Sequence, residues 1–291
     1  MSIIYPGFVG YANIGGQIVR CNDFSVNIKQ EALFYDHVLG LRDTTPTSIY
    51  TIKGDGGDKG PTEQYNAQKI LWRPGVKLSQ GGFTFPWTDI NMGLLWEEAR
   101  GGKTFDMDFK YSCGIARRFN KCKVNSYALK VSNGDIVSSS LDIMAIHEEI
   151  IELPDGDLYT ANEKIMTWDA VNITIDDDPA PNLVSFDFTI NNACIPIYTA
   201  GSNASDTNPL EAKEIRVGMQ QLTGTMSSYE ENSLNYLDFV DSSKTIKLNF
   251  NNGEFIIKIT AVFRPMEQSA AVGPVIRTLP FTGVDYNILV T

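Results

Sequence analysis

Few residues in this chain of 291 have the types and spacing that catalysis or metal binding requires. Neither of the two histidines, His37 and His147, lies in a recognisable catalytic motif, and the serine-nucleophile pattern G-x-S-x-G is absent. The cysteines form no C-x-x-C pair, the spacing typical of structural zinc; they are Cys21, Cys113, Cys122 and Cys194. The sequence therefore predicts neither an enzyme nor a protein with a metal or cofactor.

Two further clusters resemble ligand sites only superficially. Residues 54–61 (GDGGDKGP) are glycine-rich, but Lys59 is followed by Gly60 and Pro61 and not by the Ser or Thr that opens a phosphate-binding helix. We expect a mobile loop there. Residues 176–178 are three aspartates that could bind Ca²⁺, yet no EF-hand spacing follows, and a turn before Pro179 explains them.

The chain is acidic, and its acidity is uneven. It carries 24 Lys and Arg against 35 Asp and Glu, a formal net charge of −11. Residues 1–150 hold 16 basic and 16 acidic side chains, whereas residues 151–291 hold 8 and 19. An acidic surface repels phosphate, which argues against sequence-specific nucleic-acid binding. We expect the only basic cluster to face an acidic neighbour in preference to nucleic acid; it comprises Arg117, Arg118, Lys121 and Lys123.

The composition is that of a globular protein, with 43% hydrophobic and 20% charged residues. No stretch approaches the roughly 18 uninterrupted apolar residues of a membrane span. Residues 1–16 lack the basic and apolar regions of a secretory signal, so we expect reduced cysteines. Cys113 and Cys122 flank a predicted turn, GIARRFNK, and a bridge between them stays open as an alternative.

Most of the sequence alternates with period two, which predicts β-strands. Two alternating runs around an Asn-Gly turn predict a hairpin, and this occurs at residues 124–131 with 137–145 and at residues 245–250 with 254–263. Residues 171–175 and 183–190 predict a third hairpin, joined by the acidic turn. Helical spacing is limited to residues 31–41, 89–100 and 229–241, the second of which should stop at Gly101 and Gly102. A β-sandwich or barrel with short flanking helices follows.

The two halves of the chain resemble each other at a constant sequence offset. Lys103-Thr104 matches Lys244-Thr245, and at the same spacing Phe109 matches Phe250. At this offset Val76, Leu78 and Thr84 also meet Val217, Met219 and Thr225, and residues 25–28 resemble residues 170–173 at a similar spacing. We interpret this as two tandem units of strands, a helix and a hairpin, over residues 1–150 and 151–291. Chance similarity of amphipathic strands is the alternative.

Three segments also resemble the tail tube proteins of bacteriophages. Residues 120–131 with 134–137 are similar to that family's "G-C-x-V-N-S-L-S-L … G-D-I-V" hairpin. Residues 169–175 and 184–192 look like its second-half hairpin, and residues 222–226 (LTGTM) resemble the strand before its flanking helix. The resemblance implies β-sandwich subunits whose hairpins join into a barrel around a channel. It also implies stacked rings, a virion location and assembly in the host cytoplasm.

For a subunit with two tandem tube units, the resemblance implies trimeric rings with pseudo-sixfold symmetry, with a hexamer of whole chains as the alternative. Implied partners are further copies, the terminator, baseplate and tape measure proteins, a sheath in a contractile tail, and DNA as transiting cargo. Ring closure also satisfies sheet edges that would otherwise lack partners. Other ring-forming tail components (a tail terminator, a baseplate hub, a contractile injection tube) are the nearest alternatives, and a carbohydrate-binding β-sandwich using Trp72, Trp87 and Trp96 is a more distant one.

We expect the two Asn-Gly hairpins to build the ring. Their candidate assembly residues are Val124, Tyr127, Leu129, Val131, Val137, Leu141, Ile246, Leu248, Phe250, Phe255, Ile257 and Ile259. The glycine-rich loop, with Asp55, Asp58 and Lys59, is the candidate contact to the adjacent ring.

Overall fold

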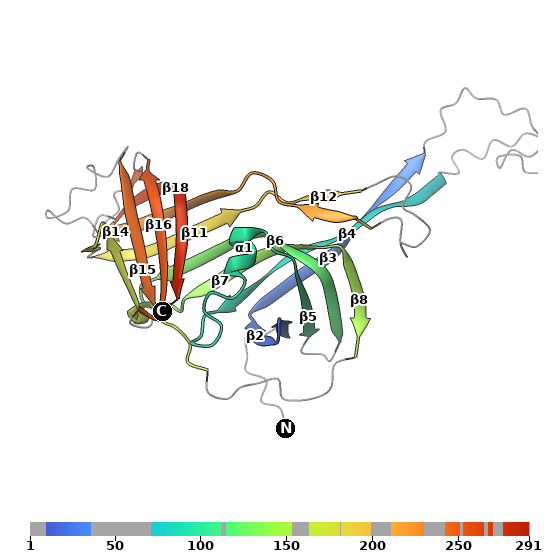
Figure 1. The fold of residues 1–291 in the computed structure, drawn as a ribbon, viewed down its shortest axis with the longest axis horizontal. Coiled ribbons are helices and arrows are strands. Elements are labelled where there is room, and N and C mark those ends of the chain that lie inside the picture. Colours follow the sequence, from blue (N-terminus) through green and yellow to red (C-terminus); the bar gives the residue numbers. More distant parts are fainter. Residues whose placement is uncertain are drawn as a thin grey trace, which may run out of the picture.

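The computed structural model describes residues 10–35, 71–111, 115–152, 163–180, 182–198, 211–229, 242–250, 253–264, 267–269 and 276–290. Within these ranges the chain is almost entirely antiparallel β-structure, with one α-helix, α1 (Trp96–Gly101), and a 3₁₀ turn, η1 (Trp168–Ala170) (Figure 1). No helix in this part of the chain has the length and apolar character to cross a membrane.

The strands of the first half are β1 (Gly10–Ile14), β2 (Gln17–Cys21), β3 (Asp23–Tyr35), β4 (Leu71–Pro86), β5 (Phe105–Tyr111), β6 (Ala116–Ser132), β7 (Ser138–Ala145) and β8 (His147–Ile151). Those of the second half are β9 (Val171–Ile175), β10 (Asp178–Pro179), β11 (Leu183–Asn191), β12 (Ile195–Ile197), β13 (Glu214–Arg216), β14 (Gln221–Tyr229), β15 (Ser243–Phe250), β16 (Phe255–Phe263), β17 (Glu267–Ser269) and β18 (Ile276–Val290).

The long strand β6 joins two sheets. Its first part pairs with β5 and β8, and β5 continues through β1 to β2. Its last part lies between β7 and β11. The larger sheet therefore runs β3-β4-β7-β6-β11-β14-β18-β16-β15-β9-β10 and carries strands from both halves. The β6–β11 ladder joins the two halves within this sheet.

The pairing order of the first half recurs in the second half. β2-β1-β5-β6-β8 corresponds to β10-β9-β15-β16-β18, and β3-β4-β7-β6 corresponds to β11-β14-β18-β17. Every one of these pairings is antiparallel. The register also recurs: Thr84 lies opposite Asp23, and Thr225 lies opposite Asp187. Thr84 and Thr225 are separated by the same offset that relates the two halves in the sequence.

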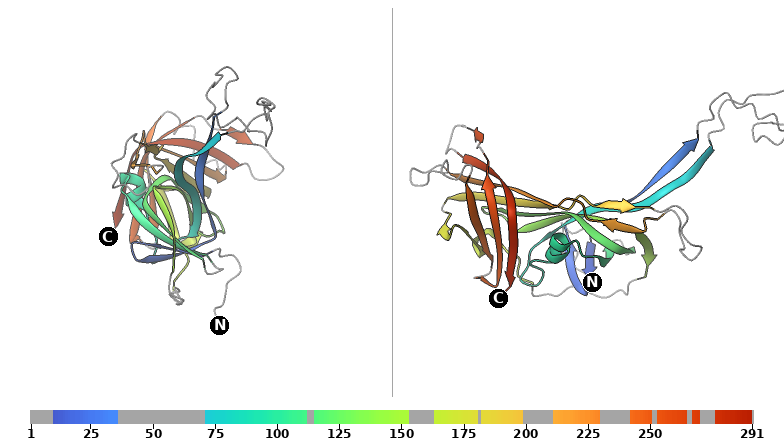
Figure 2. Two further views of the ribbon diagram at one scale, coloured as in Figure 1. Left: turned by 90° about the vertical axis from the view of Figure 1, so that its right-hand side faces the viewer. Right: turned by 45° about the horizontal axis from the view of Figure 1, so that its top comes forward.

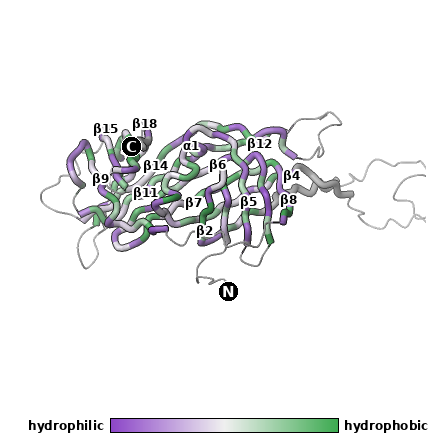
Figure 3. The backbone as a smooth tube through the Cα atoms, turned by 60° about the horizontal axis from the view of Figure 1, so that its bottom comes forward, coloured by the Kyte–Doolittle hydropathy of each residue, from purple (hydrophilic) through white to green (hydrophobic). Residues whose placement is uncertain are grey.

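One continuous core fills the space under the larger sheet. It contains buried residues of both halves, such as Phe83, Tyr127, Phe186, Ile257 and Phe281. Helix α1 covers this apolar face, and Trp96 makes edge-on contacts with Tyr127 and Phe188 at ring-centroid distances of 5.7 Å. Hydrophilic and hydrophobic residues alternate along the strands (Figure 3), as expected for a sheet with one buried face.

Both Asn-Gly hairpins are confirmed. β6 pairs with β7, and β15 pairs with β16 from Phe250 opposite Phe255 to Ser243 opposite Val262. Helix α1 ends where the sequence predicted, because Gly102 adopts a left-handed conformation (φ 59°) that a residue with a Cβ rarely takes. The helix begins only at Trp96, since residues 89–95 form turns.

Three local predictions were wrong. Residues 31–35, predicted to be helical, belong to β3, because pairing with β4 overrides the local helical pattern; residues 36–41 lie outside the described part. Residues 171–175 and 183–190 do not pair, since β9 lies between β10 and β15 and β11 lies between β6 and β14. Most of the predicted turn GIARRFNK is the start of β6. The helix expected at 229–241 lies outside the described residues except for Tyr229, which ends β14.

Candidate assembly surfaces

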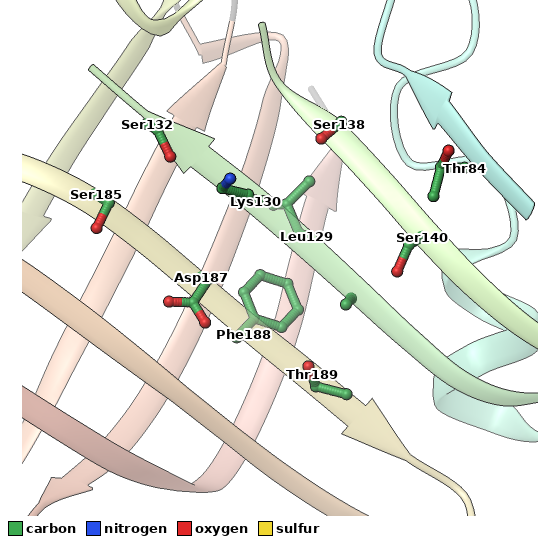
Figure 4. Close-up of a pocket in the computed structure, with 11 residues that line it drawn as sticks. Thr84, Leu129, Lys130, Ser132, Ser138, Ser140, Ser185, Asp187, Phe188 and Thr189 are labelled. Atoms are coloured by element: carbon green, nitrogen blue, oxygen red, sulfur yellow. The ribbon is translucent and has the colours of Figure 1, made fainter. Parts of the chain in front are cut away.

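The face of the larger sheet opposite α1 is polar and hollowed. A hollow of about 680 Å³ lies over β4, β6, β7 and β11 (Figure 4). Hydroxyl groups dominate its lining: Thr84, Ser132, Ser138, Ser140, Ser185 and Thr189. Ala128, Leu129 and Phe188 also border the hollow. Leu129 and Phe188 belong to the buried core, and such core residues alternate with the hydroxyl residues along each strand.

Small side chains and balanced charge characterise the hollow. Its charged residues are Lys130 on β6 and Asp187 on β11, which lie directly opposite each other in the ladder between the two halves. The Thr225 hydroxyl donates a hydrogen bond to the Asp187 carboxylate. No group of three His, Cys, Asp or Glu side chains with metal-binding geometry occurs among the described residues. The surface thus offers weak hydroxyl contacts and no concentrated charge.

The polar surface continues past the hollow onto β14. Gln221, Thr223, Thr225 and Ser227 lie opposite Asn191, Thr189, Asp187 and Ser185 of β11, while Leu222 and Met226 point into the core. This surface was not predicted from the sequence, because the apolar positions of each strand indicate only which residues form the core. The sequence feature that could have predicted this surface is the set of Ser, Thr and Ala residues that alternate with the apolar positions.

A buried hydrogen-bond chain supports the sheet from the core side. The Trp87 indole donates to the Ser139 hydroxyl at 2.6 Å, and Ser139 donates to the Tyr127 hydroxyl at 2.9 Å. Burial raises the pKa of Tyr127 above its ordinary value, which keeps the phenol neutral. Trp87 also packs on Phe250 and Phe255, with ring centroids 4.9 and 5.5 Å away. One residue of the first half thus anchors a hairpin of the second.

The short strands β12 and β13 form an arm between β11 and β14 that reaches back over the first half. Cys194, just before β12, and Ile215 of β13 bury Leu78 and Met144 in a small apolar cluster separate from the main core. Near the arm, the carboxylate of Glu211 lies 2.8 Å from His147 Nδ1 and 3.8 Å from Lys77 Nζ. The arm is therefore held by apolar packing and by polar contacts.

Several strands have a partner on only one edge within the described part of the chain. β3 pairs with β4 alone, and β17 pairs with β18 alone. An open edge presents backbone N–H and C=O groups that another strand can use. β3 and β4 also extend together away from the body as a long arm (Figures 1 and 2).

Comparison with known families agrees with this architecture. The family model described as "Phage tail tube protein" matches residues 23–283, which is most of the chain. The chain belongs to the phage tail tube protein family. No curated protein matches it. It is therefore a structural tail tube protein, a component of the virion tail that assembles into a tube with other tail proteins.

In this tail tube protein the twelve candidate assembly residues all lie on the buried side of their strands. Val124, Tyr127, Leu129, Val131, Val137, Leu141, Ile246, Leu248, Phe250, Phe255, Ile257 and Ile259 belong to the common core and are at most 5% exposed. Their side chains therefore stabilise the subunit, and any contact between subunits by these hairpins must use their polar faces or edges. Asp55, Asp58 and Lys59 lie outside the described residues.

Most of the basic cluster has partners within the tail tube protein itself. Arg117 pairs with the buried carboxylate of Glu148, which also accepts a hydrogen bond from Ser79 at 3.0 Å. Arg118 makes two hydrogen bonds to Asp108, at 2.7 and 3.0 Å. Lys123 donates to the carbonyl of Gly102, and Lys121 is exposed. The acidic partners of this basic cluster, Glu148 and Asp108, therefore lie in the first half of the same chain.

The remaining candidate sites are structural. Asp176 and Asp177 form a turn with positive φ angles and pair with Lys244 and Lys247. Cys21, Cys122 and Cys194 are buried free thiols, so the Cys113–Cys122 bridge does not form. Trp87 and Trp96 are buried in the core, which removes them from any sugar-binding platform.

Proposed function

We propose that this tail tube protein is the repeating ring subunit of the tube wall, and that the polar face of its larger sheet lines the channel through which DNA is ejected. The observation that carries the proposal is the hollow of hydroxyl groups on the side of the sheet opposite α1. Rings of such subunits stack into the tube, which terminator, baseplate and tape measure proteins complete, together with a sheath in a contractile tail.

The chemistry of the polar face suits a channel for DNA. A wall rich in Lys or Arg would bind phosphates and release counterions, which holds DNA in place. The hollow has one lysine, Lys130, with Asp187 opposite it, and otherwise mainly short hydroxyl side chains. Such a wall offers DNA hydrogen bonds similar to those of water and has no concentration of positive charge that would bind the phosphates and halt transport.

We further propose that residues 1–150 and 151–291 are tandem copies of one tube unit, so that three chains form a ring of six units. The recurring strand order and the recurring Asp–Thr register support this proposal. The β6–β11 ladder then represents one of two alternating joints around the ring. Closing the ring gives the open strands their partners, which removes edges that would otherwise promote aggregation.

Electron microscopy of the purified protein tests ring formation, since the proposal fails if rings and tubes are absent at high concentration. A charge test then addresses the channel. Ser140→Arg and Thr189→Arg place cations on the polar face and should leave assembly intact while slowing DNA ejection from phage carrying the variant. Gln17→Arg, at an exposed position on β2, is the matched control. Normal ejection by both polar-face variants in assembled tails would contradict a channel-lining role.

A further inference from the structure

Two large apolar side chains at one end of the β14–β18 ladder are exposed. Met219 is 79% exposed and Val284 is 64% exposed. The β14–β18 ladder ends with Leu222 opposite Gly283, so Val284 follows the last pair directly and Met219 lies shortly before Leu222. Both therefore lie at the same end of this ladder. Exposed apolar side chains grouped in this way mark an interaction surface.

The corresponding positions of the first half are covered. Leu78 corresponds to Met219 at the offset that relates the two halves, and Met144 corresponds to Val284 at almost the same offset. Leu78 and Met144 lie at the same end of the β4–β7 ladder. They are only 7% and 8% exposed, because Cys194 and Ile215 at the β12–β13 arm pack over them. The two halves thus carry equivalent pairs of apolar residues. The β12–β13 arm buries the pair in the first half, and the pair in the second half is exposed to solvent.

The first half has an extended arm of its own, formed by β3 and β4, that could cover an apolar pair in the same way. β3 and β4 hold the places that β11 and β14 hold in the second half, and together they form the long extension seen in Figures 1 and 2. The register of this arm places Phe34 opposite Trp72 and Tyr35 opposite Leu71. These paired positions are all apolar or aromatic in the sequence. In its own chain the arm leads away from β14 and β18 and not over them.

We propose that the β3–β4 arm of a second copy of this chain docks on Met219 and Val284, in the way that the β12–β13 arm covers Leu78 and Met144 within one chain. The proposal rests on the ring function proposed above and specifies the joint between neighbouring chains of one ring. The occupant is a defined segment of an identical molecule, the outer part of the arm at residues 30–35 and 71–77, which lies beyond the pairing of β4 with β7.

The open strand edges agree with this joint. Within the chain, β11 pairs with β6 and then leads into the β12–β13 arm. The strand equivalent to β11 in the first half is β3, which forms one side of the β3–β4 arm and has an open edge. The strand equivalent to the last part of β6 is β17, which also has an open edge in the described structure. A single neighbour can therefore supply both a strand for β17 and an arm for Met219 and Val284. Backbone pairing fixes the alignment, and apolar burial adds stability.

Photo-crosslinking in assembled rings tests which segment covers the pair. Benzoylphenylalanine replaces Met219 in ¹⁵N-labelled chains, which are mixed with unlabelled chains before assembly and irradiation. We expect mixed-isotope crosslinked peptides that join position 219 to the outer part of the arm, residues 30–35 or 71–77. The same probe at Ile150, which is 78% exposed on β8, is the control and should not give these peptides. Crosslinks from position 219 only within its own chain, or only to other segments, would overturn the proposal.

A second measurement uses Met219→Lys and Val284→Lys, with Ile150→Lys as the matched control. Each variant at the docking site should lower the fraction of chains in rings at least about tenfold at a fixed concentration, because a charged side chain resists burial. Thermal unfolding of the monomer should be unchanged, since all three positions are exposed. Wild-type protein that forms no rings would refute the ring function itself, whereas rings formed equally well by both variants would refute only this joint.

Discussion

The side-chain amide of Asn192 donates a hydrogen bond to the backbone carbonyl of Ala99 at 2.7 Å, so a residue of the second half closes the end of helix α1 in the first half. Asn192 is completely buried and also donates to the carbonyl of Val124 at 2.8 Å. The last carbonyls of a helix lack intrahelical partners. The Gln220 side-chain amide also donates to the carbonyls of Ala99 and Arg100, at 3.0 Å each, so two amides of the second half hold the end of α1, and Asn192 links it to β6.

Replacing Asn192 with Leu should lower the free energy of unfolding by about 2–3 kcal/mol, because two buried carbonyls lose a donor. Urea denaturation followed by circular dichroism measures the change. Asn172→Ala, at an exposed position on β9, is the control and should stay within about 0.5 kcal/mol of wild type. Equal stability of Asn192→Leu and wild type would show that the contact contributes nothing.

Trp87 should be among the most costly core positions to truncate. Its ring contacts Phe250 and Phe255, and its indole N–H binds Ser139. Trp87→Ala should lower the unfolding free energy by about 3–5 kcal/mol through the cavity and the lost hydrogen bond. Trp168→Ala, in the partly buried turn η1, should cost clearly less. A smaller effect at Trp87 than at Trp168 would contradict the proposed anchoring of the β15–β16 hairpin.

Stability should depend on pH through Asp176. A hydrogen bond from the Thr245 backbone N–H and the nearby Lys244 lower the pKa of this carboxyl below its ordinary value. A lowered folded-state pKa gives stability that is present above the unfolded pKa of about 3.9 and is lost as pH falls through the folded-state pKa.

Asp176→Asn removes the charge but keeps a residue that tolerates the positive φ of 51° at this turn. The side chain is 43% exposed, so solvent screening limits the expected loss at pH 7 to less than about 1 kcal/mol. Urea midpoints of wild type and variant, measured from strongly acidic to neutral pH, should differ at neutral pH and converge at the acidic end. A difference that grows on acidification would contradict this assignment.

The described cysteines should be unreactive in the native protein. Burial raises the pKa of Cys194 to about 11 and raises the pKa values of Cys21 and Cys122 above their ordinary value, and the thiolate is the reactive form. In a Cys113→Ser variant, Ellman's reagent at mildly alkaline pH should detect almost no thiol until urea is added, and all three remaining thiols afterwards. Rapid labelling of native protein would place at least one of these thiols at the surface.

Local patterns predicted the parts of the fold that local contacts determine. Phe250 pairs with Phe255, which is close to it in sequence, so alternation and turn residues were sufficient to predict this hairpin. The wrong predictions concern strands whose partners are distant. β9 pairs with β15, which follows only after five intervening strands, and Tyr35 pairs with Leu71. Nothing near Val171 or Glu31 in sequence specifies those partners.

The candidate surfaces depended even more on distant pairing. Period-two alternation identified the core side of β6 and β7, and the residues between, such as Ser138 and Ser140, were available as the polar side. That these residues join Ser185 and Thr189 in one hollow follows only from the β6–β11 ladder, which links segments from different halves of the chain. The exposure of Met219 likewise could not be predicted from the sequence, because its equivalent Leu78 is covered by a distant segment of the chain.

A cryo-electron microscopy reconstruction of the assembled tube tests the central proposal most directly. It should show three chains in each ring, with Ser140 and Thr189 facing the channel and α1 on the far side of the sheet. Six chains in each ring, or α1 facing the channel, would contradict the account.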